Sequence, residues 1–230
     1  DYYCDWSSDV CSSDLNSSVA KNTYERYINN VNSTVLNISH SNIKDNRIKK
    51  HSNSNEPLKI TYIGSIEKYK GLYFLLDVLR ELLKDNISKW NLNVYGKNVN
   101  INIDEFMGKV KIKGTYVYSD LEELFKNTDV LIVPSIWYET FGYIALEAFS
   151  YAVPVILTDL VGFKDMVKSG TDGIVIKADE DELYKNLGAI IEDREKLSYI
   201  NNNILNLASI YTMKKHASDI MELYSGLIKE

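Results

Sequence analysis

Residues 130–148 read VLIVPSIWYETFGYIALEA, and the order of side chains in this stretch predicts a strand, a loop and a helix. The aliphatic run at 130–133 is short and stops at Pro134, which is typical of a buried strand that runs into a loop. Gly142 then opens an apolar segment, 142–150, that is long enough to form a helix. The stretch is therefore one strand–loop–helix step of an α/β fold.

The same step recurs along the chain from Leu58 onward. Short runs rich in β-branched residues alternate with amphipathic segments at intervals of roughly thirty residues. This alternation predicts parallel strands with right-handed crossovers, and hence an α/β fold with a Rossmann-like, doubly wound sheet of about six strands. The expected strands are 59–63, 91–95, 110–113, 130–133, 154–158 and 173–176. The expected helices are 70–83, 120–125, 142–150, 181–191 and 213–228.

Composition excludes several classes of protein. The chain has 230 residues, of which 45% are hydrophobic and 25% charged, so it resembles an ordinary globular protein rather than a disordered one. Its net charge of −6, with no basic block, argues against nonspecific binding to nucleic acid. No apolar run approaches the roughly 20 residues that span a bilayer.

The first 56 residues differ from the rest. Residues 1–15 contain both cysteines, Cys4 and Cys11, show no periodicity and resemble a translated sequencing adapter. We set them aside as extraneous, the alternative being a small disulfide loop. A short helix is expected at 19–28 and a strand at 34–38. Residues 39–56 have almost no apolar side chain to bury, which predicts a linker.

The first strand of the sheet is followed by residues suited to a phosphate. Gly64 and Ser65 end the strand, and Lys70 and Gly71 open the next helix. A glycine permits close approach of a ligand, and a helix start offers free N–H groups. The spacing matches neither a P-loop nor GxGxxG. The alternative is a solvated lysine beside an ordinary turn.

Two carboxylates, Glu139 and Glu147, flank the start of the helix at 142–150. On one continuous helix they would lie about 12 Å apart along the axis and roughly 80° apart around it. A glycosidase pair needs carboxyl groups within about 5–9.5 Å of each other, so we expect them instead to hold separate parts of one long ligand. The alternative is an acid favoured by the helix dipole and a solvated glutamate. The apolar residues around Glu147 argue against that alternative.

Other polar features have simpler explanations. Asp179-Glu180-Asp181 matches a D-x-D metal motif, but it opens a helix, so we expect Asp179 to cap that helix and we predict no metal. Trp137 and Tyr138 either stack on a sugar or pack the loop. The histidines are far apart in the sequence and are expected to be solvated rather than ligands: His40, His51 and His216.

Together these motifs resemble the GT-B-fold, retaining glycosyltransferases of the family 4 type. Glu139 and Glu147 fit that family's E-x7-E motif, and the resemblance runs from residue 60 to about 228. Further matching motifs, in order, are Gly64, Lys70-Gly71, Gly114, 119–129, Pro134-Ser135, Phe141-Gly142, Leu146-Glu147-Ala148, Pro154-Val155-Ile156, Gly162, Gly170 and Gly173.

The resemblance implies how the chain is organised. Residues 57–208 would be the nucleotide-sugar-binding domain, the C-terminal half of a GT-B fold. Residues 16–38 would be a remnant of the N-terminal domain, 39–56 the linker and 209–230 the C-terminal crossover helix. We expect a bacterial enzyme of polysaccharide synthesis in fragment form, with little transfer activity alone.

It also implies partners and a location. The donor would be a nucleoside-diphosphate sugar, with no metal or other cofactor. A glycan, lipid or other acceptor would be bound through the missing domain. The absence of cysteine beyond residue 15 fits a reducing cytoplasm. The missing domain would allow peripheral contact with the inner face of the membrane.

Individual roles follow from the same resemblance. Glu147 would accept hydrogen bonds from the ribose, Glu139 would contact sugar hydroxyls, and Lys70 would neutralise the diphosphate, these last two acting in catalysis. The remaining donor-binding positions would be Gly64, Ser65, Thr115, Tyr116, Phe141, Gly142, Tyr143 and Ile144.

The sequence departs from the family at two of these places. Ser65 stands where the family usually has an arginine on the diphosphate, and Lys68 is the nearest substitute. Asp165 replaces a glutamate. Ser65 favours an alternative function, a catalytically silent nucleotide-binding or assembly module. A GT-B-type sugar-nucleotide epimerase is a further alternative.

Overall fold

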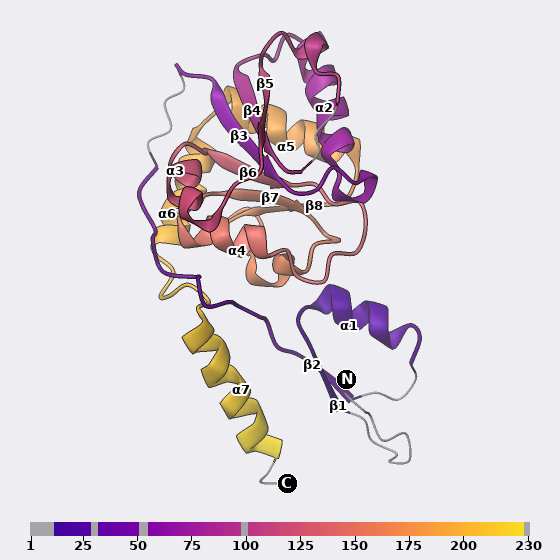
Figure 1. Cartoon of the computed structure of the whole chain (residues 1–230), viewed down its shortest axis with the longest axis vertical. Helices are drawn as coiled ribbons and strands as arrows, with labels where there is room; N and C mark the ends of the chain where they lie inside the picture. Colours follow the sequence, from indigo (N-terminus) through magenta and orange to yellow (C-terminus); the bar gives the residue numbers. More distant parts are fainter. Residues whose placement is uncertain (1–11, 29–31, 51–54, 98–100, 228–230) are drawn as a thin grey trace.

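The computed structural model describes residues 12–28, 32–50, 55–97 and 101–227. Its centre is a six-stranded parallel sheet in the order β5-β4-β3-β6-β7-β8 (Figure 1). This is the 3-2-1-4-5-6 order of a doubly wound sheet, so the predicted fold class is confirmed. The strands are β3 (Leu58–Ile63), β4 (Trp90–Tyr95), β5 (Val110–Gly114), β6 (Val130–Val133), β7 (Val155–Thr158) and β8 (Ile174–Ile176).

Helices cover both faces of the sheet. The helices α2 (Leu72–Lys84) and α5 (Glu180–Glu192) pack side by side, whereas α4 (Tyr143–Ser150) packs on β6 and β7 (Figure 1). Because both faces are covered, β6 and β7 are buried along their whole length. The remaining helices here are α3 (Leu121–Lys126), α6 (Glu195–Leu205) and the short η1 (Lys68–Lys70), η2 (Asp104–Phe106), η3 (Tyr118–Asp120) and η4 (Gly162–Met166).

The helix α6 is absent from the sequence prediction. It follows α5 after Arg194, which is buried and whose guanidinium donates to the carbonyl of Ile190, in the last turn of α5. A second nitrogen of Arg194 donates to the carbonyl of Lys89, the residue before β4. Hydrogen bonds from an arginine to backbone carbonyls leave no apolar pattern in the sequence, so the sequence does not reveal this junction between α5 and α6.

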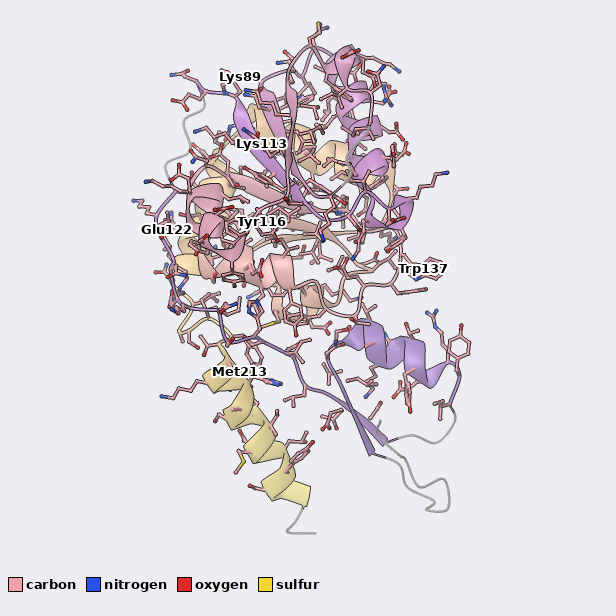
Figure 2. All side chains as sticks on the ribbon, viewed as in Figure 1. Lys89, Lys113, Tyr116, Glu122, Trp137 and Met213 are labelled. Atoms are coloured by element: carbon pink, nitrogen blue, oxygen red, sulfur yellow. The ribbon has the colours of Figure 1, made fainter. Side chains whose placement is uncertain are left out.

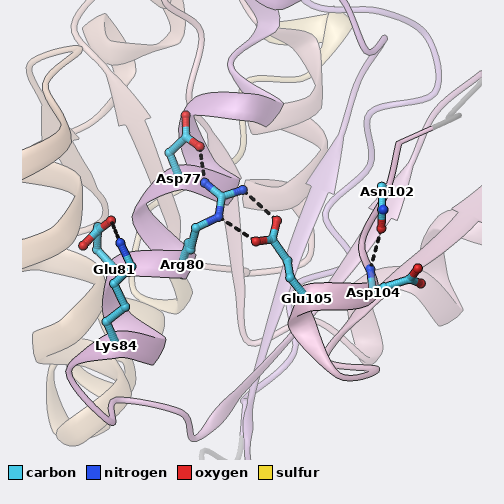
Figure 3. A network of polar contacts seen from close by, with 7 residues as sticks. All are labelled: Asp77, Arg80, Glu81, Lys84, Asn102, Asp104 and Glu105. Carbon is cyan, nitrogen blue, oxygen red and sulfur yellow. Dashed lines mark hydrogen bonds and ion pairs between the residues drawn. The ribbon is translucent and has the colours of Figure 1, made fainter.

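A charged cluster joins α2 to η2 at the edge of the sheet (Figure 3). Arg80 donates to Asp77 on the same helix and to both carboxylate oxygens of Glu105, at 2.7 and 2.9 Å. All three side chains are well exposed, so the cluster contributes little to stability.

A second part of the chain lies beyond the sheet, near both ends of the drawn chain (Figure 1). Strands β1 (Ser12–Leu15) and β2 (Asn32–Val35) pair in parallel, with α1 (Ser18–Glu25) between them in sequence. The helix α7 (Met213–Leu227) runs beside this unit. Among its described residues, no helix of the chain is long and apolar enough to cross a membrane.

The N-terminal predictions need correction. β2 covers 32–35 rather than 34–38, and β1 occupies the end of the segment 1–15, for which no structure is expected from the sequence. α1 begins at Ser18 because the hydroxyl of Ser17 accepts from the N–H of Ala20 and caps the helix. Cys4, Cys11 and His51 lie outside the described residues.

The segment predicted as a polar linker packs closely against the sheet domain. Ile43 is 4% exposed and belongs to the main core. Arg47 donates to the carbonyls that end α6, and Lys50 to those that end α3, at Phe125 and Lys126. The N–H of Asn46 donates to Ser150 at the end of α4. Cations at helix C-termini satisfy carbonyls that lack an intrahelical partner, a role that hydrophobic patterning does not reveal.

Candidate donor site

The crevice expected at the topological switch point is present. Strands β3 and β6 are neighbours, and the chain leaves them toward opposite edges of the sheet. A cavity of about 540 Å³ lies at their carboxyl ends. Nine of the predicted site residues line it: Gly64, Ser65, Lys70, Tyr116, Glu139, Phe141, Gly142, Tyr143 and Ile144.

Lys70 and Glu139 form an ion pair inside this cavity. Lys70 Nζ lies 3.1 Å from Glu139 Oε2, and the hydroxyl of Ser135 donates to the same oxygen at 2.6 Å. Gly71 permits the start of α2 to lie close to the end of β6. Its φ is +78°, and a Cβ there would lie 1.7 Å from the carbonyl oxygen of Pro134. Only glycine therefore lets the start of α2 lie against the end of β6.

The loop that carries Glu139 is held by the segment after β7. Glu139 N donates to Leu160 and its carbonyl accepts from Gly162, at 2.9 and 2.8 Å. Gly142 has a φ of +92°, and a Cβ there would lie 2.7 Å from Val161. These contacts aim the first turn of α4 at the cavity, where its N–H groups and dipole favour an anion.

Two predicted site residues do not line the cavity, Thr115 and Glu147. Glu147 lies one turn beyond Tyr143 on α4, is 8% exposed, and has its pKa raised to about 7 by burial. Burial, with a smaller contribution from the negative charge of Glu147, raises the pKa of Tyr116, which does line the cavity, to about 12.

Glu147 has a neighbour that the sequence does not indicate. His40 Nε2 lies 3.3 Å from Glu147 Oε1, and the ring of His40 meets Tyr143 and Tyr118 edge to face. The prediction that His40 is solvated is therefore wrong: its side chain is 26% exposed. His216 is also only partly exposed and lies on α7 beside Tyr211.

Trp137 and Tyr138 line a different cavity. They do not line the cavity at β3 and β6 but a second one, of about 520 Å³, whose other wall is α1. Tyr138 accepts a hydrogen bond from Arg26 at 3.0 Å, while Trp137 remains 64% exposed (Figure 2). Loop packing against α1 thus accounts for Tyr138.

The structure also places the remaining candidates. Lys68 is exposed and does not line the cavity, so it does not replace the family's arginine at Ser65. Asp165 accepts from Ser18 at the start of α1. Asp179 caps α5 as predicted, by accepting from Glu182 N. Tyr62 lines the cavity although the sequence reads it only as a strand residue, and its hydroxyl donates to the carbonyl of Ser65.

Comparison with known proteins agrees with this geometry. The family model of glycosyl transferases group 1 matches residues 43–206, which include the whole sheet and all of the residues that line the cavity except Asn16 and Ile38. The chain belongs to this family. The group 1 match begins at Ile43, the first buried apolar residue of the linker, so the linker from residue 43 onward falls within the family's own unit.

Curated relatives share less than a third of their residues with this chain over the matched regions. An uncharacterized 41.2 kDa protein of the cps region of Klebsiella pneumoniae is 28% identical over 191 residues, covering 80% of this chain and 50% of that protein. The capsular polysaccharide biosynthesis glycosyltransferase CapM of Staphylococcus aureus is 27% identical, covering 67% and 42% respectively. The chain thus spans half or less of the length of these relatives.

Solved structures share the fold. HepE of Anabaena, in complex with UDP and glucose, matches with a TM-score of 0.71 and 18% identity, covering 92% of this chain and 62% of HepE. Sucrose-phosphate synthase of Thermosynechococcus elongatus matches with a TM-score of 0.74 and 17% identity, covering 95% and 58%. At such identities the likeness establishes the arrangement of elements.

Proposed function

We propose that this chain is the donor-binding part of a retaining glycosyltransferase that uses a nucleoside-diphosphate sugar. The observation that carries the proposal is the Lys70–Glu139 pair at the N-terminus of α4, inside the cavity at the switch point. An ammonium and helix N–H groups suit a diphosphate, and a carboxylate suits sugar hydroxyls. HepE, which shares the fold, is described in complex with UDP and glucose.

The main requirement of the proposed reaction is stabilisation of the departing diphosphate. The bond between the sugar's anomeric carbon and the diphosphate oxygen breaks, and the diphosphate departs with the electron pair. The acceptor oxygen bonds to the same carbon, on the same face, and its proton passes to the solvent or the departing phosphate. Lys70 and the first turn of α4 would stabilise the charge that develops on the diphosphate.

The remainder of the enzyme would bind the acceptor. The longer relatives, among them a capsular polysaccharide glycosyltransferase, support a glycan or lipid acceptor held outside the group 1 unit. A cytoplasmic location, with peripheral attachment at the inner face of the membrane, belongs to this proposal. The chain alone is then expected to bind donor without appreciable transfer.

Calorimetric titration with UDP and GDP tests the proposal. Lys70→Ala should weaken binding at least tenfold, because a charge-assisted hydrogen bond to phosphate is worth about 1.5–3 kcal/mol. Lys68→Ala is the matched control, since Lys68 sits in the same short helix but outside the cavity, and it should leave the affinity within about twofold. A folded chain that takes up neither nucleotide would contradict the proposal.

One observation favours a second function. Ser65 lines the cavity without the positive charge expected at its position, which suits a module that binds a nucleotide but does not turn over a donor. Joining this chain to the N-terminal half of a related enzyme distinguishes the two. If Glu139→Ala and Glu147→Ala leave the turnover of such a hybrid unchanged, the silent module is correct.

A further inference from the structure

The residue pair His40 and Glu147 joins two parts of the chain that the sequence treats as unrelated. Glu147 lies on α4, within the nucleotide-sugar-binding unit, whereas His40 lies in the segment that the sequence predicts to be a linker. Their closest atoms, Nε2 and Oε1, are 3.3 Å apart. This is an ion-pair distance, slightly longer than the usual N–H···O hydrogen bond.

The backbone fixes His40 from both sides. The carbonyl of His40 accepts from Ile43 N at 3.1 Å, and Ile43 is anchored in the main core. On the other side, the hydroxyl of Ser39 donates to the carbonyl of Tyr211 at 2.7 Å, and Ser39 is 5% exposed. His40 is therefore placed by a docked segment rather than by chance contact of a mobile side chain.

The surroundings determine which protonation states matter. His40 meets Tyr118 from η3 and Tyr143 from α4, while Tyr116 and Tyr151 feel the charge of Glu147. Burial raises the pKa of all four tyrosines, so they stay neutral near pH 7. Burial also lowers the pKa of His40 and raises that of Glu147. Near pH 7 the imidazole is neutral, and its one N–H can point at the carboxylate.

We propose that His40 is a positioning residue of the donor site, which donates its Nε2–H to Glu147 Oε1 and so leaves Oε2 to accept hydrogen bonds from the ribose hydroxyls of a nucleoside diphosphate. The inference rests on the proposed function. It adds that the linker takes part in recognition of the ribose. A buried carboxylate needs a donor to remain ionised and oriented, and the imidazole supplies it.

Loss of the imidazole N–H should therefore weaken the contacts of the protein with the ribose and leave its contacts with the phosphates unchanged. His40→Ala should weaken binding of UDP or GDP about tenfold at pH 7. The same substitution should change binding of the corresponding 2′,3′-dideoxynucleoside diphosphate less than twofold, because that probe offers no ribose hydroxyls. His40→Gln, whose amide N–H can also donate, should recover most of the affinity.

The pH dependence gives a second measurement. In the unsubstituted chain, affinity should fall as pH drops through about 7, where Glu147 takes up a proton. Without its donor the ionised form of Glu147 is less favourable, so in His40→Ala the midpoint of that fall should move to higher pH. His216→Ala is the matched control, because the ring of His216 contacts Tyr211 rather than Glu147, and it should not move the midpoint.

These measurements separate failure of the inference from failure of the proposed function. If the unsubstituted chain binds neither UDP nor GDP, the proposed function fails and the role of His40 falls with it. If it binds, but His40→Ala weakens the dideoxy probe as much as the natural nucleotide, His40 is merely structural and the inference is overturned. An unchanged affinity or an unmoved midpoint overturns it as well.

Discussion

Two acid–base pairs flank the start of α4, and they differ in what surrounds them. Lys70–Glu139 lies inside the cavity, and Ser135 donates to the same carboxylate oxygen that Lys70 contacts. His40–Glu147 lies outside the cavity lining, enclosed by tyrosine rings. The first pair is open to a ligand in the cavity, whereas the second is bordered by aromatic rings and leaves 11% of the Glu147 side chain exposed.

The difference between the two pairs shows how two carboxylates that bind one ligand could be stabilised in different ways. Under the proposed function, a diphosphate that enters the cavity would take over Lys70 from Glu139, which would keep Ser135 as a hydrogen-bond donor and contact sugar hydroxyls. Glu147 has no comparable freedom, because burial penalises its charge. In the proposed arrangement it depends on a fixed hydrogen-bond donor, which is His40 of the docked linker. The following substitutions break one pair while sparing the other.

Gly71→Ala should have the largest effect. A Cβ at this position would overlap the carbonyl of Pro134 at the end of β6, and φ is positive, so the start of α2 must move. We expect a loss of about 3 kcal/mol or more in the free energy of unfolding, measured by urea denaturation. Nucleotide binding should be lost because Lys70 moves with Gly71.

Gly108 supplies the control for this substitution. Its φ is +79°, close to that of Gly71, but a Cβ there would meet no atom within 4 Å. Gly108→Ala should therefore cost only the strain of the backbone, about 1 kcal/mol, and leave nucleotide binding intact. Equal losses in the two variants would show that the contact with Pro134 is unimportant.

Glu147→Gln should act next most strongly, and in a direction set by pH. The pKa of Glu147 in the folded chain, about 7, exceeds its ordinary 4.5, so the proton favours the folded state. The cost of the charge is absent below pH 4.5 and grows until pH passes 7. The variant should therefore be more stable than the parent at pH 8, by roughly 1–3 kcal/mol, and equal to it near pH 4.5.

Urea denaturation at several pH values from 4.5 to 8 measures this effect. Glu139→Gln is the control, because Glu139 has its charge balanced by Lys70 and Ser135 in the open cavity. It should show no gain in stability at high pH. A pH-independent difference between Glu147→Gln and the parent would mean that the carboxylate is not buried as the structure has it.

The same contrast explains what the sequence could predict. The sheet and most of its helices follow from apolar periodicity, because burial against a continuous core selects those residues. The cavity residues from Gly64 to Ile144 follow from position, since strand ends at a switch point must converge. Lys70 and Glu139 are therefore found together although 69 positions separate them.

The support for Glu147 could not be predicted in this way. His40, Arg47 and Lys50 act through backbone carbonyls or one carboxylate, in a stretch with a single buried apolar residue, Ile43. Polar contacts between distant segments leave no period in the sequence. Apolar isolation of Glu147 indicates that the carboxylate is buried, but not which side chain stabilises its charge.

Ser65→Arg should produce the smallest effect, and it sharpens the comparison by adding charge to the open pair alone. Ser65 is exposed at the rim of the cavity, so an arginine fits there without displacing the core. We expect about tenfold tighter binding of UDP or GDP by calorimetry, because a guanidinium contact with phosphate gives about 1.5–3 kcal/mol less the cost of ordering the side chain. Ser65→Gln, similar in reach but uncharged, should change the affinity little. If the arginine has no effect, or the glutamine tightens binding equally, the diphosphate does not pass Ser65.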